Sequence, residues 1–237
     1  MSFTPILAAE TIGKSFGSRQ ILKSASLWLQ PRTITVLVGR NGQGKSTLFK
    51  IACGLLRPDY GIVRFREERF TSARLPRMAR RGLFFLPERS LLSHGFTLQA
   101  HLQAVAFHAG DRGTATAVEW LDIGHLLDRY PHTLSGGERR RAELAMAVAR
   151  RPDCLLADEP FLSIMPKDAE VLSDVFRRLA AEGCAIGISG HEVPTLFDLA
   201  DDVAWMTAGT THALGTPAQA RVHDQFCREY LGPGEFR

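Results

Sequence analysis

Short apolar runs alternate with segments of helical periodicity along most of the chain, and this alternation predicts an α/β fold. Four apolar runs predict buried strands, at residues 34–38, 83–86, 154–157 and 184–189. Apolar residues at helical spacing predict helices between or after them, at residues 48–53, 139–151 and 168–182. Strands that alternate with helices usually pair in parallel, so we expect a mostly parallel sheet with helices on its faces.

The two ends of the chain carry a different pattern, which is typical of antiparallel strands. Residues 3–12 and 20–29 predict two strands, and the turn between them at 16–19 contains Gly and Ser. We expect this pair to form an antiparallel edge of the sheet. Towards the other end, the pattern predicts a hairpin and then a terminal helix, at residues 203–207, 211–214 and 217–231.

Strand patterns are missing between residues 97 and 128, where Leu and Val recur at helical spacing. We interpret this stretch as part of a helical lobe that is inserted into the α/β core. The predicted organisation is therefore one domain over residues 1–237. It divides into an α/β core at 1–87 and 139–237 and a helical lobe at 88–138.

Composition narrows the class of protein. The 237 residues are 45% hydrophobic, as expected of a chain that buries a sizeable core. The formal net charge of +4 is too small to argue for nucleic acid, and we expect no nucleic-acid partner. No apolar run approaches the roughly 20 residues needed to cross a bilayer, and no signal-peptide pattern opens the chain. The four cysteines have no metal-binding spacing, and we expect buried free thiols in a reducing cytosol.

A glycine-rich stretch, GRNGQGKST at residues 39–47, follows the first predicted buried strand and leads into a predicted helix. Its glycines let several backbone N–H groups point at one anion, and the helix N-terminus adds partial positive charge. Lys45 is placed to reach the β- and γ-phosphates, and the Ser46 hydroxyl to bind Mg²⁺. A glycine-rich turn without a ligand is the alternative, but the full pattern between a strand and a helix favours a P-loop nucleoside triphosphate site.

Polar groups stand at the ends of two other predicted elements. Ser135 in LSGGE can cap the helix that follows it, and the glycines at 136 and 137 suggest a second anion site. Asp158 and Glu159 come at the carboxyl end of a buried strand, where two acids are costly unless they meet a metal or a water. Solvated loop acids are the alternative, and the strand context favours a site.

Three further features leave alternatives open. Phe16 beside its turn is equally consistent with a surface side chain and with an aromatic that stacks on a nucleotide base. His191 follows the strand at 184–189, and from the residues alone a local cap is favoured over a phosphate contact. Four arginines near helical spacing favour a solvated basic helix face over an anion contact, namely Arg74, Arg77, Arg80 and Arg81.

The order GRNGQGKST, LSGGE, LLADEP and SGHE resembles the nucleotide-binding subunits of ATP-binding cassette (ABC) transporters over nearly the whole chain. The LSGGE motif, about twenty residues before LLADE, is the specific part of this resemblance. The resemblance implies that ATP is bound by Phe16, Gly39, Asn41, Gly42, Gly44, Lys45, Ser46 and Thr47. It also implies that a second subunit's ATP is contacted by Ser135, Gly136 and Gly137.

The same resemblance implies the catalytic roles. Lys45 would meet the phosphates, Glu159 would activate the attacking water, and His191 would sense the γ-phosphate, in place of the capping role. Mg²⁺ would be held by Ser46, Asp158 and Glu88. Two positions depart from the family pattern, since Glu88 stands where Gln is usual, and Met165 stands where an Asp normally helps communication across the dimer.

The function implied by the resemblance is ATP hydrolysis that drives transport through separate transmembrane permease subunits. The chain would lie at the cytoplasmic face of the membrane, as a homodimer or with a paralogous ATPase. Its motifs look like those of the cluster that holds branched-chain amino-acid importers and lipopolysaccharide exporters. Two alternatives stay open: a soluble cassette ATPase of the iron–sulfur assembly type, and a scaffold that binds ATP without turnover.

Overall fold

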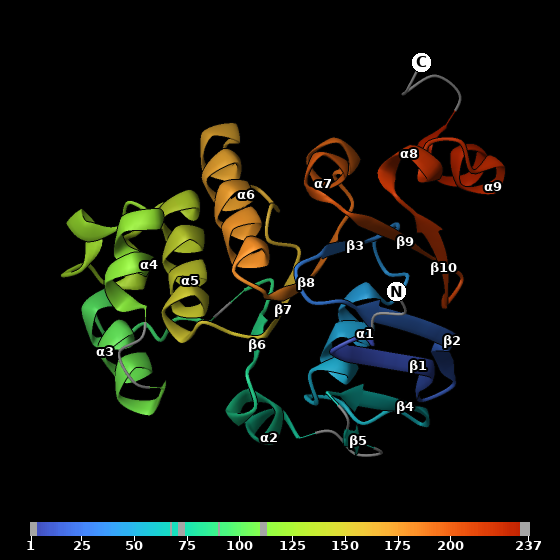
Figure 1. The fold of residues 1–237 in the computed structure, drawn as a ribbon, viewed down its shortest axis with the longest axis horizontal. Helices are drawn as coiled ribbons and strands as arrows, with labels where there is room; N and C mark the ends of the chain where they lie inside the picture. The colour runs from blue at the N-terminus through green and yellow to red at the C-terminus, as the bar shows by residue number, and fades with distance from the viewer. Residues whose placement is uncertain (1–3, 67, 71–73, 90, 110–112, 233–237) are drawn as a thin grey trace.

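The fold is built around one mixed sheet, in which the computed structural model places ten strands among the residues that it describes, which are 4–66, 68–70, 74–89, 91–109 and 113–232. The strand order is β5-β4-β1-β2-β10-β9-β3-β8-β7-β6 (Figure 1). The parallel part consists of β3 (Ile34–Val38), β6 (Leu83–Leu86), β7 (Cys154–Asp158), β8 (Ala185–Gly190) and β9 (Asp202–Thr207). The predicted parallel α/β core is therefore confirmed, and the sheet as a whole is mixed.

The antiparallel edge is also confirmed, with changed bounds. It contains β1 (Leu7–Phe16), β2 (Arg19–Leu29), β4 (Tyr60–Phe65) and β5 (Glu68–Phe70). The first strand was expected at 3–12, but it runs on to Phe16 because β2 pairs along its full length. Its register shifts near Thr11, which has a positive φ of 53°, and such bulges blur the alternation that defines a strand in sequence.

The last part of the chain forms the expected hairpin but not one terminal helix. β10 (Thr210–Gly215) pairs antiparallel with β9, and it also touches β2. The single helix expected at 217–231 is wrong, because the chain forms three short pieces, α8 (Pro217–Ala220), α9 (Asp224–Phe226) and the π-helix η3 (Cys227–Leu231). The break has a local cause: the His223 ring accepts the Phe226 N–H and so starts a new helix.

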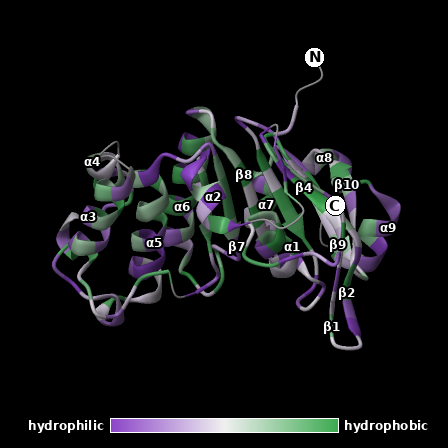
Figure 2. Ribbon diagram, turned by 90° about the horizontal axis from the view of Figure 1, so that it is seen from below, coloured by the Kyte–Doolittle hydropathy of each residue, from purple (hydrophilic) through white to green (hydrophobic). Residues whose placement is uncertain are grey.

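Two hydrophobic cores lie on opposite faces of the parallel sheet, because side chains alternate between the faces of a strand. On one face, α1 (Lys45–Ala52) packs between the parallel sheet and the antiparallel layer, and its Phe49 is fully buried. On the other face lie α6 (Pro166–Ala181) and α7 (Val193–Leu199). Figure 2 shows this distribution, with apolar residues concentrated on the strands and on the inner faces of the helices.

The helical region lies at one end of the molecule, away from β1, β2 and β4 (Figure 1). Its helices are α3 (Leu98–Ala109), α4 (Thr114–Trp120) and α5 (Gly136–Arg150), with the short 3₁₀ turns η1 (Gly124–Leu126) and η2 (Pro131–Thr133). A short helix, α2 (Leu75–Arg80), precedes β6. Helix α5 contacts α3 and α4 on one side and α6 on the other. The proposed boundary at residue 138 thus falls inside α5, and the division into core and lobe stays a prediction.

Two expectations from composition can be compared with the structure. Cys53, Cys154 and Cys184 are buried free thiols, as expected, and burial raises the pKa of Cys53 to about 12. Cys227 is only partly buried. In the part of the chain that the structure describes, no helix combines the length and the apolar character needed to cross a membrane.

Candidate nucleotide site

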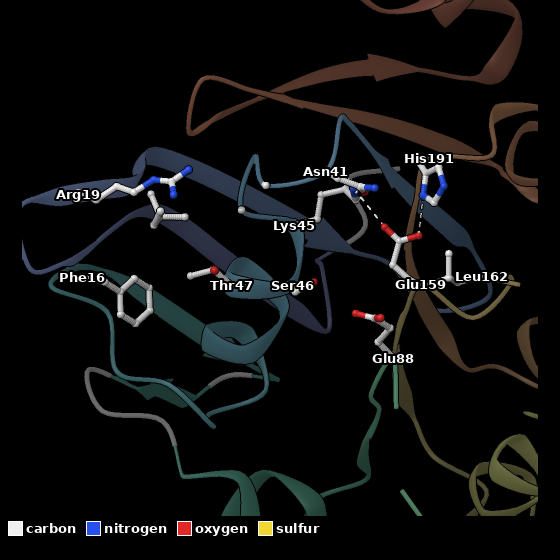
Figure 3. A pocket seen from close by; sticks show the side chains of 13 residues that line it. Phe16, Arg19, Asn41, Lys45, Ser46, Thr47, Glu88, Glu159, Leu162 and His191 are labelled. Atoms are coloured by element: carbon white, nitrogen blue, oxygen red, sulfur yellow. Dashed lines mark hydrogen bonds and ion pairs between the residues drawn. The ribbon is translucent and has the colours of Figure 1, made fainter. Parts of the chain in front are cut away.

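The candidate site lies where the parallel strands end. Strands that run in the same direction bring their carboxyl ends to one edge of the sheet, and ligands of open α/β sheets bind there. Here the register places Val38 beside Gly190 and Asp158 beside Ser189. The loops that follow these ends line a pocket of about 470 Å³ (Figure 3). Its lining includes Phe16, Asn41, Gly42, Gly44, Lys45, Ser46, Thr47, Glu88, Glu159 and His191.

The phosphate loop has the backbone that its glycines predict. Gly42 and Gly44 have φ values of 81° and 108°, in the left-handed region that favours glycine. A Cβ on Gly44 would also approach Leu22 Cδ2 to 2.7 Å. Gly44 is the N-cap of α1 and gives it no side-chain cap, and the first turn contains no acid. The first N–H groups of α1 therefore remain free to bind an anion in the pocket.

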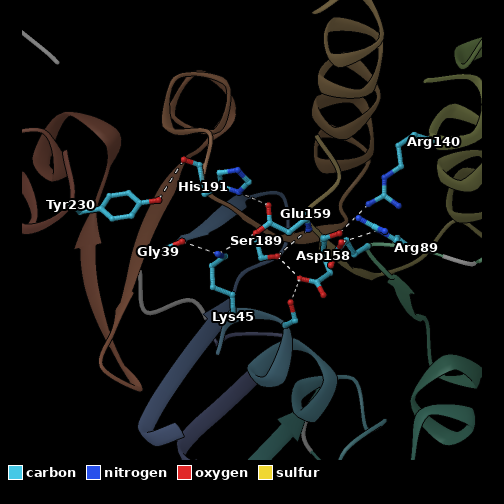
Figure 4. A network of polar contacts seen from close by, with 11 residues as sticks. Gly39, Lys45, Arg89, Arg140, Asp158, Glu159, Ser189, His191 and Tyr230 are labelled. Atoms are coloured by element: carbon cyan, nitrogen blue, oxygen red, sulfur yellow. Dashed lines mark hydrogen bonds and ion pairs between the residues drawn. The ribbon is translucent and has the colours of Figure 1, made fainter. Parts of the chain in front are cut away.

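Lys45, Glu159 and His191 form a connected group beside this loop (Figures 3 and 4). Lys45 Nζ lies 2.7 Å from Gly39 O and 3.1 Å from Glu159 Oε1. The other carboxylate oxygen of Glu159 is 3.0 Å from His191 Nδ1. Lys45 is 5% exposed and the Glu159 side chain 10%, so both charges lie largely out of water. The Glu159 carboxylate thus forms an ion pair with Lys45, the residue that the sequence analysis expects to contact phosphate.

The backbone at Glu159 is unusual for a residue of its kind. Its φ is 46°, in the left-handed region where a non-glycine residue is strained. The Glu159 N–H donates to Ser189 Oγ at 3.1 Å, which helps to hold this conformation. Backbone strain of this kind concentrates at functional sites, and here it turns the carboxylate towards Lys45 and His191.

Asp158 lies deeper in the protein and faces the first turn of α1. One of its oxygens, Oδ1, accepts hydrogen bonds from Ser46 Oγ at 3.0 Å and from Ser189 Oγ at 2.6 Å. Burial raises the pKa of Asp158, and the two hydroxyl donors oppose that rise. A carboxylate paired with a hydroxyl at the phosphate-loop helix is the donor set that Mg²⁺ takes together with phosphate oxygens. The residues present therefore fit this ion.

Two of the remaining candidate residues, Glu88 and Phe16, line the pocket, whereas Met165 lies at the start of α6. Glu88 follows β6, and its carboxylate points into the pocket while lying 3.2 Å from Arg89 Nε (Figure 3). Phe16 lines the other end of the pocket, on the far side of Thr47 from Glu159, and is 51% exposed. Met165 is 71% exposed and stands at the N-cap of α6 without a side-chain cap.

Two sequence interpretations of single residues are decided by geometry. The sequence around His191 favoured a local capping role, and this is wrong. The N-cap of α7 is Glu192, and no side chain caps the N-terminus of this helix. Instead, His191 faces Glu159. Ser135 does cap α5, in a capping box in which its hydroxyl accepts the Glu138 N–H and Glu138 accepts the Ser135 N–H.

The LSGGE segment does not join the pocket of its own chain. Ser135 and Gly137 are absent from the pocket lining, and Gly136 lines an adjoining cleft of about 360 Å³ that shares Glu88, Glu159 and Leu162 with the pocket. A Cβ on Gly137 would lie 1.8 Å from an Asp168 carboxylate oxygen, so a larger residue at this position would require the Asp168 side chain to move.

Sequence reasoning missed several residues around the site. Ser189 bridges Asp158 and the Glu159 backbone, and its signal was a hydroxyl at the end of an otherwise apolar strand. Tyr230 of η3 donates to His191 O at 3.5 Å, and burial raises its pKa to about 12. Nothing in the local sequence around Tyr230 indicated this contact, because it joins segments 39 residues apart.

Replacing Ser189 with Ala is expected to destabilise the protein. The substitution leaves the partly buried Glu159 N–H without its acceptor and the buried Asp158 without one donor, at a cost of about 1–3 kcal/mol. Urea unfolding of Ser189→Ala and wild type measures the difference. Ser173→Ala, which removes another buried serine hydroxyl in α6, is the matched control. Equal loss in both variants would show that the Ser189 network adds nothing of its own.

Comparison with known proteins agrees with this geometry. The ABC transporter family model matches residues 22–162. The lipopolysaccharide export ATP-binding protein LptB of Haemophilus influenzae is 32% identical over 96% of this chain and 97% of that protein. LptB of Escherichia coli K12 is 30% identical over 95% and 97%. A nucleotide-free ATP-binding cassette from an ABC transporter has the same fold, with a TM-score of 0.81 and 23% identity, over 92% of this chain and 94% of that one.

This chain belongs to the ABC transporter family and is one of its ATP-hydrolysing, nucleotide-binding subunits. The resemblance found in its motifs is thereby confirmed, as are ATPase activity and nucleotide binding. A second solved cassette, in its ADP conformation, shares the fold with a TM-score of 0.81 and 22% identity, over 92% of this chain and 94% of that one.

Proposed function

We propose that this chain hydrolyses ATP at the cytoplasmic face of a membrane and so drives transport through separate permease subunits. Family membership supports an ATPase of a transporter, and the relatives named for lipopolysaccharide export suggest an amphiphilic cargo as the first to test. Two copies, or one copy and a paralogue, would hold two ATP molecules head to tail. Hydrolysis would then separate the two halves and move the membrane partner.

The observation that supports the head-to-tail arrangement is the position of the LSGGE segment outside the pocket of its own chain. The phosphate loop faces the pocket, whereas Ser135 and Gly137 lie outside it. A capped helix that begins with two glycines and lies outside its own chain's pocket is suited to a phosphate held by another chain. The site is then complete only when two chains meet.

In this proposal each pocket residue has a distinct task. Lys45 and the N–H groups of α1 bind the β- and γ-phosphates, and Phe16 covers the base. Ser46 and Asp158 would hold Mg²⁺, which would supply positive charge to the transferred phosphoryl group. Glu159 orients and deprotonates the attacking water.

The contacts of Glu159 give this site a resting state. Its carboxylate lies against Lys45 and His191, where it supplies negative charge to two groups that would otherwise face phosphate. ATP brings more negative charge than one carboxylate, so it can displace Glu159 from Lys45. The released carboxylate is then free to take the water. Binding of the substrate and readiness of the base are coupled in this way.

Replacing Glu88 with Gln is expected to raise the basal ATPase rate of the isolated chain. Glu88 adds a negative charge beside the phosphate site, and this charge opposes closure of the site on ATP until a partner moves the loop. If the substitution removes about 1 kcal/mol of repulsion from the closed state, the ATPase rate should rise about fivefold. Steady-state phosphate release at saturating ATP and Mg²⁺ measures it, with Glu119→Gln on the exposed face of α4 as control. An equal or lower rate in Glu88→Gln would mean that the carboxylate works as a metal ligand.

The transport proposal is tested by isolating the native complex. A tagged chain is purified from detergent-solubilised membranes of its own host, and the partners are identified by mass spectrometry. We expect a polytopic membrane protein whose presence raises ATP turnover, and whose effect disappears with Glu159→Gln. Recovery of the chain only with soluble partners, or a membrane protein that leaves turnover unchanged, would contradict coupling to transport.

A further inference from the structure

Arg140 of α5 is a buried arginine whose contacts all lie at the junction between the helical region and the sheet. Its side chain is 6% exposed. Its Nε donates to Pro160 O at 3.1 Å and one terminal nitrogen donates to Asp158 O at 3.0 Å. The other terminal nitrogen donates to Pro87 O at 2.7 Å and to Glu143 Oε2 at 2.8 Å. Figure 4 shows the guanidinium reaching from α5 towards the end of β7.

The three carbonyl groups that Arg140 contacts all belong to residues next to Glu159 or Glu88 in the chain. Asp158 O and Pro160 O belong to the residues on either side of Glu159, and Pro87 O belongs to the residue before Glu88. A single planar guanidinium therefore holds the backbone next to both carboxylates. A lysine ammonium lacks this fork of donors and is a single point charge.

We propose that Arg140 is a positioning residue for Glu159 and Glu88, and that it links the orientation of α5 to the placement of both carboxylates. The proposal rests on the proposed role of Glu159 in hydrolysis. Because Arg140 lies two turns or less from Ser135, movement at the LSGGE end of α5 reaches the pocket acids through one side chain. The strained backbone at Glu159, with φ of 46°, is the kind of conformation that needs such support.

Glu143 completes the arrangement as the counter-charge. It lies one turn further along α5, and its side chain is 4% exposed. A buried ion pair is often no more stabilising than apolar residues of similar size, so stability alone gives little reason for this pair. Its contribution in this structure is geometric: the carboxylate fixes the guanidinium so that its other donors meet the three carbonyls.

Two variants separate positioning from stability. Arg140→Lys keeps the positive charge beside Glu143 but cannot hold three carbonyls at once. The paired variant Arg140→Met/Glu143→Leu removes both charges together, so that no buried charge is left unpaired. We expect kcat for ATP to fall at least about tenfold in both, because a misplaced catalytic group costs that much or more. The Kd for ATP, measured in Mg²⁺-free buffer, should stay within about twofold, since Arg140 does not line the nucleotide pocket.

The control and the coupling to Glu88 complete the test. Arg150→Lys makes the same change at the other end of α5, where Arg150 donates to Ala79 O at 2.6 Å, and it should leave kcat unchanged. The effect of Glu88→Gln on turnover should disappear in the Arg140→Lys background, because coupled groups are not additive. Wild-type kcat in either Arg140 variant overturns the proposal, as does a loss of ATP affinity or melting temperature that accounts for the loss of kcat. An inactive wild type would instead refute the role in hydrolysis.

Discussion

Glu159→Gln is expected to stop ATP turnover and to accumulate an ATP-bound dimer. The substitution keeps the size and hydrogen bonding of the side chain but removes the base, and loss of a general base slows a reaction by about 10²–10⁴-fold. It also removes the charge that holds Lys45 in the resting state, so ATP should bind at least as tightly as in wild type. Phosphate release measures turnover, and size-exclusion chromatography with ATP and Mg²⁺ measures the dimer.

A matched control for this experiment is Glu170→Gln, which removes one charge from an exposed position on α6. It should leave turnover and oligomeric state unchanged. Turnover of Glu159→Gln near the wild-type rate would remove Glu159 from the reaction. A protein that hydrolyses poorly yet stays monomeric with ATP at high concentration would contradict a homodimer and direct the search to a paralogous partner.

Lys45→Ala is expected to abolish turnover by preventing productive binding of the phosphates. The ammonium group is the buried positive charge of the pocket that faces Glu159, and Ala offers the β- and γ-phosphates nothing in its place. The ATP affinity should fall at the same time, because binding and catalysis use the same group. Equilibrium binding of a fluorescent ATP analogue and phosphate release measure the two effects.

The same substitution leaves the Glu159 carboxylate, which is 10% exposed, without its lysine partner. Breaking a buried pair in this way costs about 3–5 kcal/mol, so the fold must be checked by circular dichroism. The double variant Lys45→Ala/Glu159→Gln removes the unpaired charge and should recover stability without recovering activity. Lys50→Ala, at an exposed position of α1, is the control. Near-normal turnover in a folded Lys45→Ala protein would refute the assignment of the site.

Local sequence was sufficient for the features that depend on one segment alone. The buried strands can be recognised in the sequence as apolar runs, because both faces of a parallel sheet are covered. The phosphate loop needs glycine where φ is positive, and Gly42 and Gly44 meet that need within the segment itself. Ser135 and Glu138 form their capping box within one turn. A site at Asp158 and Glu159 was expected because ligands of open α/β sheets bind at the carboxyl ends of strands.

Only the tertiary structure decided which of these groups touch. Lys45 meets Glu159 and Ser46 meets Asp158 across more than a hundred residues of sequence. Ser189 contacts the Asp158 carboxylate and the backbone N–H of Glu159. Such contacts depend on strand register and on the packing of α1 and α5 against the sheet, which no local pattern encodes. Arg140 is the clearest case, since the sequence shows only three consecutive arginines after LSGGE. Arg140 contacts three backbone carbonyls only because the fold buries it against the ends of β6 and β7.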